Sequence, residues 1–176
     1  MFFREKLPIC IFFSKENGVP FPVTSLTRKQ ASLYLTNVPQ VEAMRWKFNP
    51  QQAQLIPAHV TLCREDEVDD WQLLHERIEA IKDFELTLSF GEPKRDENFV
   101  YLPIVDGDDR FHDLRRVLLD KEPRRATPHV TIIHPRNGIC DDQAFHEIRR
   151  EITPFQFTFR EIFRIQQFAG EGWIRF

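Results

Sequence analysis

Two segments of the chain repeat the pattern histidine, valine, threonine and an aliphatic residue, the first beginning at His59 and the second at His129. Their aliphatic and β-branched residues favour strands. Because side chains two residues apart in a strand point to the same face, His59 shares a face with Thr61, and His129 shares one with Thr131. Each segment therefore presents an imidazole and a hydroxyl side by side on a rigid element.

Two such histidines suit acid–base catalysis on a phosphodiester. Opening a 2′,3′-cyclic phosphate, or joining or breaking a 2′-5′ linkage, requires a proton removed from the nucleophile and another given to the leaving oxygen. An imidazole titrates near neutral pH, so one histidine can act as base while the other acts as acid. The hydroxyls of Thr61 and Thr131 can hydrogen-bond the non-bridging oxygens as negative charge develops. This chemistry needs no metal and no other cofactor.

The histidines have two other interpretations. A single histidine on a strand is usually a structural residue, but two histidines in matched surroundings favour a shared role. A metal site is the second interpretation. His129 and His134 are five residues apart, which suits neither a helix face nor a strand face, and no cysteine or carboxylate stands at ligand spacing in either segment. We therefore expect no metal site.

Further residues could support a phosphate site. Arg64 and His134 each stand five residues after a motif histidine. Strict alternation would put them on the opposite face, so a bulge or a strand end must redirect them toward the phosphate. Arg136 could attract a phosphorylated ligand at the mouth of a cleft, and Tyr101 could stack on a base, although a solvated loop and a core position are the alternatives. The other basic residues predicted in loops are Lys94, Arg95, Arg124 and Arg125.

The expected elements follow the same order in both halves of the chain: strand, helix, motif strand, helix, strand. The first half has strands over 31–36, 57–64 and 84–90 and helices over 39–48 and 68–82. The second half has strands over 98–105, 128–134 and 155–159 and helices over 109–119 and 141–152, followed by strands over 162–168 and 173–176. This order predicts an α+β fold that is bilobal and duplicated, with two antiparallel sheets and outer helices around a central cleft.

Composition limits the partners. The chain has 176 residues and a formal net charge of −3, so it is not a generally basic nucleic-acid coat, and phosphate binding must be local. We expect a small nucleotide or an RNA end as partner. Three cysteines without a CxxC pair favour a reducing cytoplasm. No segment reaches a membrane-spanning length. We expect a cytoplasmic monomer with an N-terminal extension over 1–30 and one bilobal domain over 31–176.

Paired His-x-Thr-x motifs on the strands of a duplicated lobe resemble those of the 2H phosphoesterases, which include the 2′-5′ RNA ligases and the cyclic nucleotide phosphodiesterases. The resemblance covers roughly residue 31 to the C-terminus. It implies that His59 and His129 are the acid–base pair and that Thr61 and Thr131 contact phosphate. Members of the RNA ligase type often carry an arginine where this chain has His134. Here Arg64 holds the matching place after the first motif.

These observations predict a metal-independent phosphodiesterase, similar to a 2′-5′ RNA ligase, that acts on a 2′,3′-cyclic phosphate or a 2′-5′ linked nucleotide or RNA end. Two alternatives stay open. One is a binding module that senses a nucleotide without turnover, against which the intact histidines and threonines argue. The other is an exonuclease that trims RNA 3′ ends.

Overall fold

The computed structural model describes residues 27–81 and 83–176. A strand expected at 8–14 and a turn expected at Asn17-Gly18 lie outside the described residues. Strand β1 (Thr27–Tyr34) begins before residue 31, so it includes the last positions that were assigned to the N-terminal extension. The boundary between extension and domain stays a prediction.

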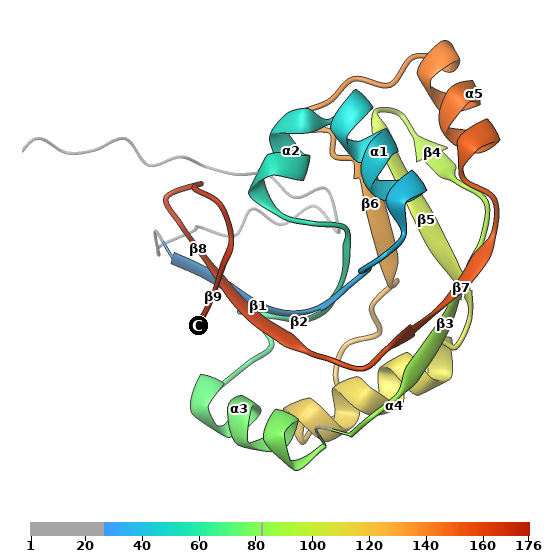
Figure 1. The fold of residues 1–176 in the computed structure, drawn as a ribbon. Helices are drawn as coiled ribbons and strands as arrows, with labels where there is room; N and C mark the ends of the chain where they lie inside the picture. Colours follow the sequence, from blue (N-terminus) through green and yellow to red (C-terminus); the bar gives the residue numbers. More distant parts are fainter. Residues whose placement is uncertain (1–26, 82) are drawn as a thin grey trace, which may run out of the picture.

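The strands form two antiparallel sheets, as predicted, and Figure 1 shows how they are arranged. The first sheet has the order β2 (His59–Arg64), β1, β8 (Phe163–Phe168) and β9 (Ile174–Arg175). The second has the order β4 (Lys94–Asp96), β5 (Phe99–Asp106), β3 (Leu86–Phe90) and β7 (Phe155–Phe159), and β6 (His129–Ile133) also pairs with β5. The two halves of the chain do not build one sheet each, because β3 joins the second sheet while β8 and β9 complete the first.

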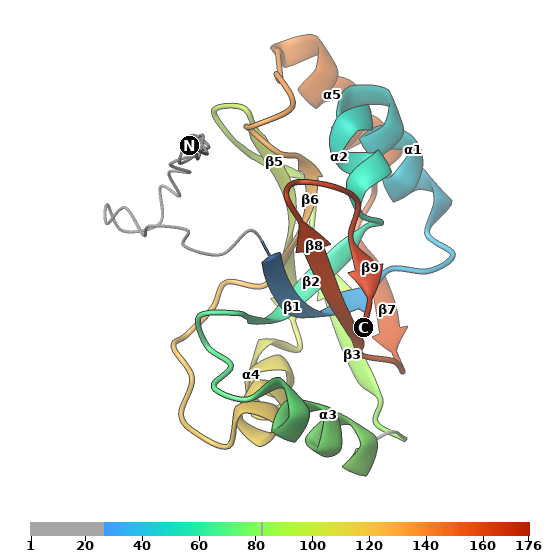
Figure 2. The ribbon, with the colours of Figure 1, turned by 90° about the vertical axis from the view of Figure 1, so that its left-hand side faces the viewer.

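Five helices flank the sheets within the described part of the chain: α1 (Pro39–Phe48), α2 (Pro50–Leu55), α3 (Trp71–Ala80), α4 (Asp108–Leu119) and α5 (Asp142–Glu151). Figures 1 and 2 show α3 and α4 together at one end of the molecule, and α1, α2 and α5 together at the other. Two acidic side chains cap helix starts. Asp70 accepts hydrogen bonds from the backbone of Gln72 (2.7 Å) and Leu73 (3.2 Å), and Asp141 accepts one from Ala144 (2.7 Å). Asp141 is the first residue of the helix that the sequence predicts over 141–152, and it is the cap of α5.

Three local predictions were wrong or incomplete. Helix α2 was not predicted; it follows α1 directly, and Pro50 fits its first turn because that position needs no N–H partner. Lys94 and Arg95 lie in β4, which pairs with β5, and not in a loop. For α4, helical spacing predicts an apolar stripe made of Phe111, Leu114, Val117 and Leu118, but Val117 is 55% exposed, while Arg115 is buried at 1% exposure.

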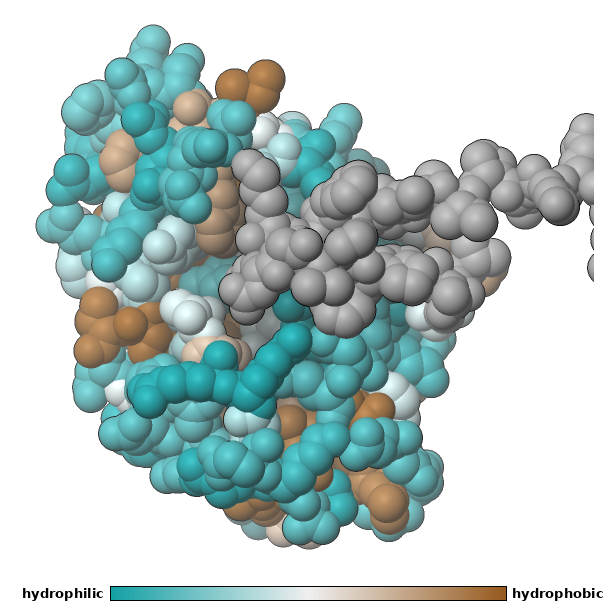
Figure 3. Space-filling model, turned by 180° about the vertical axis from the view of Figure 1, so that it is seen from behind, coloured by the Kyte–Doolittle hydropathy of each residue, from teal (hydrophilic) through white to brown (hydrophobic). Residues whose placement is uncertain are grey.

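One hydrophobic core extends behind both motif strands. Val60 and Leu62 of β2 and Val130 and Ile132 of β6 are all buried in it, as their alternation with the motif residues predicted. None of the helices in the described ranges is long and apolar enough to cross a membrane. The face shown in Figure 3 is mainly hydrophilic, and its apolar residues lie in small separate groups.

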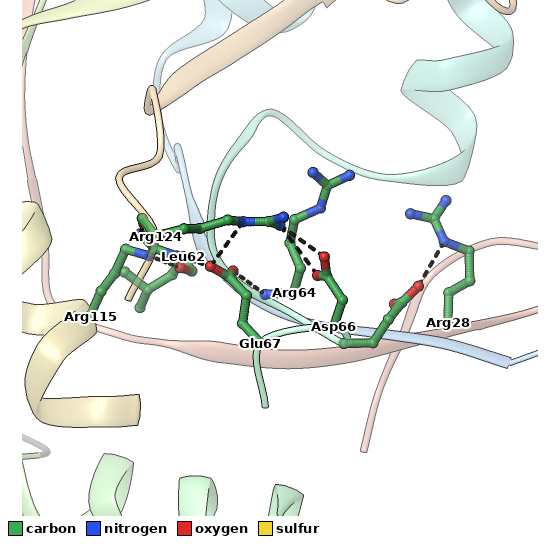
Figure 4. Close-up of polar contacts among 8 residues, drawn as sticks. Arg28, Leu62, Arg64, Asp66, Glu67, Arg115 and Arg124 are labelled. Atoms are coloured by element: carbon green, nitrogen blue, oxygen red, sulfur yellow. Dashed lines mark hydrogen bonds and ion pairs between the residues drawn. The ribbon is translucent and has the colours of Figure 1, made fainter. Parts of the chain in front are cut away.

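A buried ion pair connects the second half of the chain to the first motif strand (Figure 4). Arg115 of α4 pairs with Glu67, which lies after β2. Arg115 also donates to the carbonyl oxygens of Leu62 (2.8 Å) and Arg124 (2.7 Å). Glu67 accepts from the backbone N–H of Arg64 at 3.2 Å. The pair therefore fixes the end of β2 against α4 and against the segment that leads into β6.

We expect Arg115→Ala to lower the free energy of unfolding by about 3 kcal/mol, because it removes the donor to the Leu62 carbonyl and leaves the buried Glu67 carboxylate with only the half-exposed Arg124 as its ion-pair partner, at 3.3 Å. Arg116→Ala is the matched control, since Arg116 is the next residue on α4 and its ion pairs with Asp113 and Glu122 are exposed. It should cost no more than about 1 kcal/mol. Urea unfolding of both variants measures the difference. Equal losses would show that the buried pair has no special structural role.

Candidate active site

The two motif strands meet at the junction between the sheets. Strand β2 is at the edge of the first sheet, β6 pairs with β5 in the second, and β2 and β6 contact each other. His59 and His129 lie close enough for the charge of one to act on the other. The structure therefore brings together the two histidines that the sequence singles out. We call the surface that carries them the seam.

Each motif strand contains a bulge at the same place, three residues after its histidine. The pairing of β1 with β2 skips Leu62, and the pairing of β5 with β6 skips Ile132. An extra residue of this kind reverses the alternation of side chains that follow it. Arg64 and His134 consequently return to the face that carries the histidines, as the sequence required for any role at the phosphate.

Burial along the strands follows this bulge. In both segments the histidine, the threonine and the residue five positions after the histidine are partly exposed, while the residues between them are buried. The partly exposed residues are His59, Thr61 and Arg64 on β2, His129 and Thr131 on β6, and His134 directly after β6. One face of each motif strand thus belongs to the core and the other to the seam.

Both motif histidines are held in the same orientation. Nδ1 of His59 lies 2.8 Å from the carbonyl oxygen of Pro57, and Nδ1 of His129 lies 2.8 Å from the carbonyl oxygen of Thr127. A carbonyl oxygen can only accept, so Nδ1 must carry the proton in each neutral ring. The other nitrogen, Nε2, is then left to exchange a proton with a substrate.

Although His59 is partly exposed at the seam, the surrounding protein atoms desolvate its ring, and this disfavours the charged form and lowers the pKa of His59 to about 4. The hydrogen bond to Pro57 acts in the opposite direction, and the positive charges of Arg45 and His129 lower the pKa further. His59 is therefore neutral at physiological pH and available as a base.

His134 differs from the motif histidines in its bonding. Its pKa is also lowered to about 4, by burial and then by the charges of Arg136, Arg28 and His129. Its Nδ1 accepts from the backbone N–H of Arg136 at 3.2 Å, which leaves Nε2–H as a donor. At neutral pH it can give a phosphate oxygen one hydrogen bond but no positive charge.

Sequence reasoning missed the residues that support the start of β2. Arg45 of α1 is 2% exposed and donates to the carbonyl oxygen of Ile56 at 2.7 Å. It pairs with Glu42 at 2.9 Å, and Glu42 accepts from the backbone N–H of Ala58. The available signal was an arginine four residues after Val41 on the buried side of α1, where an apolar residue would be expected.

Asn49, between α1 and α2, supports the end of β6 and was also missed. Its side chain is fully buried, and its Oδ1 accepts from the backbone N–H of His134 at 2.9 Å. Gly138 packs against it, because a Cβ there would stand 2.9 Å from the Asn49 amide nitrogen. Nothing in the local sequence pattern marks an asparagine that acts across the molecule.

Aromatic rings lie beside both histidines. Tyr101 is opposite Thr131 in the β5–β6 pairing, and its ring centre lies 5.6 Å from that of His129. Tyr101 stacks on Phe99 at 4.8 Å. Tyr34 is opposite His59, with ring centres 6.4 Å apart. Tyr101 therefore adjoins the seam, and contact with a base stays a prediction.

The other candidate residues are placed as follows. Arg95, Arg124 and Arg125 take part in ion pairs with Asp142, Asp66 and Asp108 respectively. Among the described residues, no group of three or more histidine, cysteine or acidic side chains could hold a metal ion. Cys63 and Cys140 are buried and free.

Comparison with known proteins identifies the family of the chain and agrees with its fold. The family model described as the 2′-5′ RNA ligase superfamily matches residues 35–170, so the chain belongs to that superfamily. Membership implies phosphoesterase activity on RNA ends. A search of curated proteins finds no significant match.

Solved structures with the same fold have distant sequences. Escherichia coli LigT, crystallised with phosphate, has a TM-score of 0.54 and 15% identity, covering 85% of this chain and 93% of its own. A conserved protein of unknown function from Agrobacterium tumefaciens also has a TM-score of 0.54, with 12% identity and coverage of 85% and 84%. Both likenesses concern the fold alone.

The low pKa values of His59 and His134 predict how stability depends on pH. In the unfolded chain both rings titrate near 6.5, so between about pH 6.5 and 4 the unfolded state binds more protons. Stability should therefore fall as the pH is lowered through this range, by on the order of 1 kcal/mol per pH unit for each histidine. Urea unfolding at a series of pH values measures the slope.

The variant His134→Gln should reduce that slope, because one of the two contributing groups is gone. The control is His146→Gln, since His146 is exposed on α5. It should keep the wild-type slope. A wild-type slope in His134→Gln would contradict the assignment of a low pKa to His134.

Proposed function

We propose that this chain is a metal-independent phosphodiesterase that acts on 2′,3′-cyclic phosphates or 2′-5′ linked nucleotide or RNA ends. The observation that carries the proposal is the matched pair of imidazoles. His59 and His129 come from equivalent strands, have the same tautomer when neutral and both leave Nε2 for a substrate. The phosphate in the LigT crystal gives separate support, because that protein shares the fold.

In the hydrolysis of a cyclic phosphate, His59 acts as the base. Its neutral Nε2 takes a proton from a water molecule as the water oxygen bonds to phosphorus. One of the two ring P–O bonds breaks, and protonated His129 gives its Nε2 proton to the departing ribose oxygen. Thr61 and Thr131 donate hydrogen bonds to the non-bridging oxygens. When a ribose 5′-hydroxyl replaces water as the nucleophile and the bond from phosphorus to the 3′ oxygen breaks, the same groups leave a 2′-5′ phosphodiester and a free 3′-hydroxyl.

The assignment of His59 as base follows from its lowered pKa. A base must be unprotonated in the free enzyme, and His59 meets this condition down to about pH 4. The positive charges of Arg45 and His129 also disfavour protonation of His59.

The direct test is turnover of 2′,3′-cyclic nucleotides and of RNA with a 2′,3′-cyclic phosphate end, with a chelator present. His59→Ala and His129→Ala should each lower kcat/KM by about 10²–10⁴-fold, because each removes one proton-transfer group. His146→Ala is the control, as it removes an exposed histidine far from the motif strands. Its activity should equal that of the wild type.

Other outcomes identify the alternatives. Activity that survives in either motif variant, or that the chelator abolishes, contradicts the two-histidine mechanism. Nucleotide binding without turnover would indicate a binding module. A ladder of shortened RNA products would indicate an exonuclease that removes residues from 3′ ends.

A further inference from the structure

The peptide unit that joins Pro57 to Ala58 has a hydrogen-bond partner at each end. Its carbonyl oxygen, from Pro57, lies 2.8 Å from Nδ1 of His59. Its N–H, from Ala58, donates to Oε1 of Glu42. In a planar trans peptide unit the C=O and N–H groups point in opposite directions, so this unit connects the carboxylate to the imidazole. We call this series of hydrogen bonds the Glu42 relay.

The carboxylate of Glu42 is fixed by an ion pair with Arg45. Both carboxylate oxygens accept from Nη1 of Arg45, at 3.1 Å and 2.9 Å. Arg45 is buried, and its Nη2 donates to the carbonyl oxygen of Ile56 at 2.7 Å. The two side chains therefore hold successive backbone groups ahead of β2 to helix α1, which limits how far the Pro57 carbonyl can turn.

The second motif has no counterpart of the relay. The carbonyl oxygen that lies against His129 belongs to Thr127, and the next residue is Pro128. Proline has no backbone N–H, so the peptide unit between these two residues cannot donate to a carboxylate. The two motif histidines thus share an orientation, but His59 alone of the two has a carboxylate at the far end of its peptide unit.

A carboxylate can act through such a relay because hydrogen bonds in series polarise one another. A hydrogen bond to an ionised carboxylate is stronger than one between neutral groups, and it shifts electron density toward the Pro57 carbonyl oxygen. A more negative oxygen holds the Nδ1 proton of His59 more strongly. The proton then stays on Nδ1, and Nε2 keeps the lone pair that a base needs.

We propose that Glu42 is a positioning residue for His59, and that its carboxylate, acting through the Pro57–Ala58 peptide unit, keeps Nε2 of His59 free to act as the base. The inference rests on the proposed function, in which His59 removes the proton from the nucleophile. It adds a residue that acts through the backbone and not on the substrate, and that distinguishes His59 from His129.

The test determines which ring nitrogen carries the proton, in the full chain at neutral pH without substrate. NMR spectra of protein with isotope-labelled histidine give the ratio of the Nδ1–H to the Nε2–H form for each ring. Spectra of His59→Ala and His129→Ala assign the signals. In the wild type both rings should carry the proton on Nδ1. In Glu42→Ala the ratio at His59 should fall about fivefold, because a hydrogen bond to an ionised group is lost, while the ratio at His129 should stay unchanged.

Two further variants separate the relay from a loss of packing. Glu42→Gln keeps the size of the side chain and loses its charge, so the ratio at His59 should fall about twofold. This variant decides the test if Glu42→Ala does not fold. Glu147→Ala is the matched control, since Glu147 also pairs with a cation of α1, Lys47, and its side chain is 24% exposed against 29% for Glu42. It should keep the wild-type ratio.

Turnover of a 2′,3′-cyclic nucleotide gives a second readout. Glu42→Ala should lower kcat about tenfold and leave KM within about twofold of the wild type, because Glu42 acts on the base and not on substrate binding. A fall in kcat with no change in the ratio at His59 would contradict the proposal, since Glu42 would then act by another route.

An unchanged ratio at His59 in both Glu42 variants overturns the proposal. So does an equal fall at His129, because that result would indicate a general disturbance of the seam. Failure of the proposed function is a separate result. It would show as absent turnover of cyclic phosphates by the wild type, whichever ring nitrogen carries the proton.

Discussion

The seam depends on buried polar contacts that cross from one half of the chain to the other. Arg115 of the second half holds the carbonyl of Leu62, at the bulge of the first motif strand. Asn49 of the first half holds the backbone N–H of His134, at the end of the second. Each motif strand is therefore fixed at its far end by the opposite half. Since buried charges and amides have steep costs when unpartnered, these contacts allow few alternative arrangements of the two strands.

The bulges in β2 and β6 determine which side chains share the seam face. Without an extra residue in each strand, the fifth position after the histidine would face the core. With it, imidazole, hydroxyl and a third polar group share one face on both strands. The same shift is what lets Arg64 join Arg28 at one end of the seam.

The two motif strands, β2 and β6, have matching backbone features but different electrostatic surroundings. His59 lies over the buried Arg45, and its pKa is about 4. Five residues after the motif histidine the two segments also differ, with the permanently charged Arg64 at the end of β2 and the low-pKa His134 directly after β6. The duplicated motif strands thus carry side chains in different environments. A reaction that needs one group to act as base and another to act as acid requires such a difference.

The sequence by itself determined the class of fold, most element positions and the motif set, because strand alternation and helix periodicity are local properties. It even required a redirecting feature before Arg64 and His134 could serve the site. Only the tertiary structure decided that β3 joins the second sheet, that Arg45, Arg115 and Asn49 support the seam, and that Arg28 lies near Arg136. These features arise from contacts between segments that are distant in the sequence. The desolvation that lowers the pKa of His59 arises from the packing of whole helices and strands. A local sequence pattern contains neither kind of information.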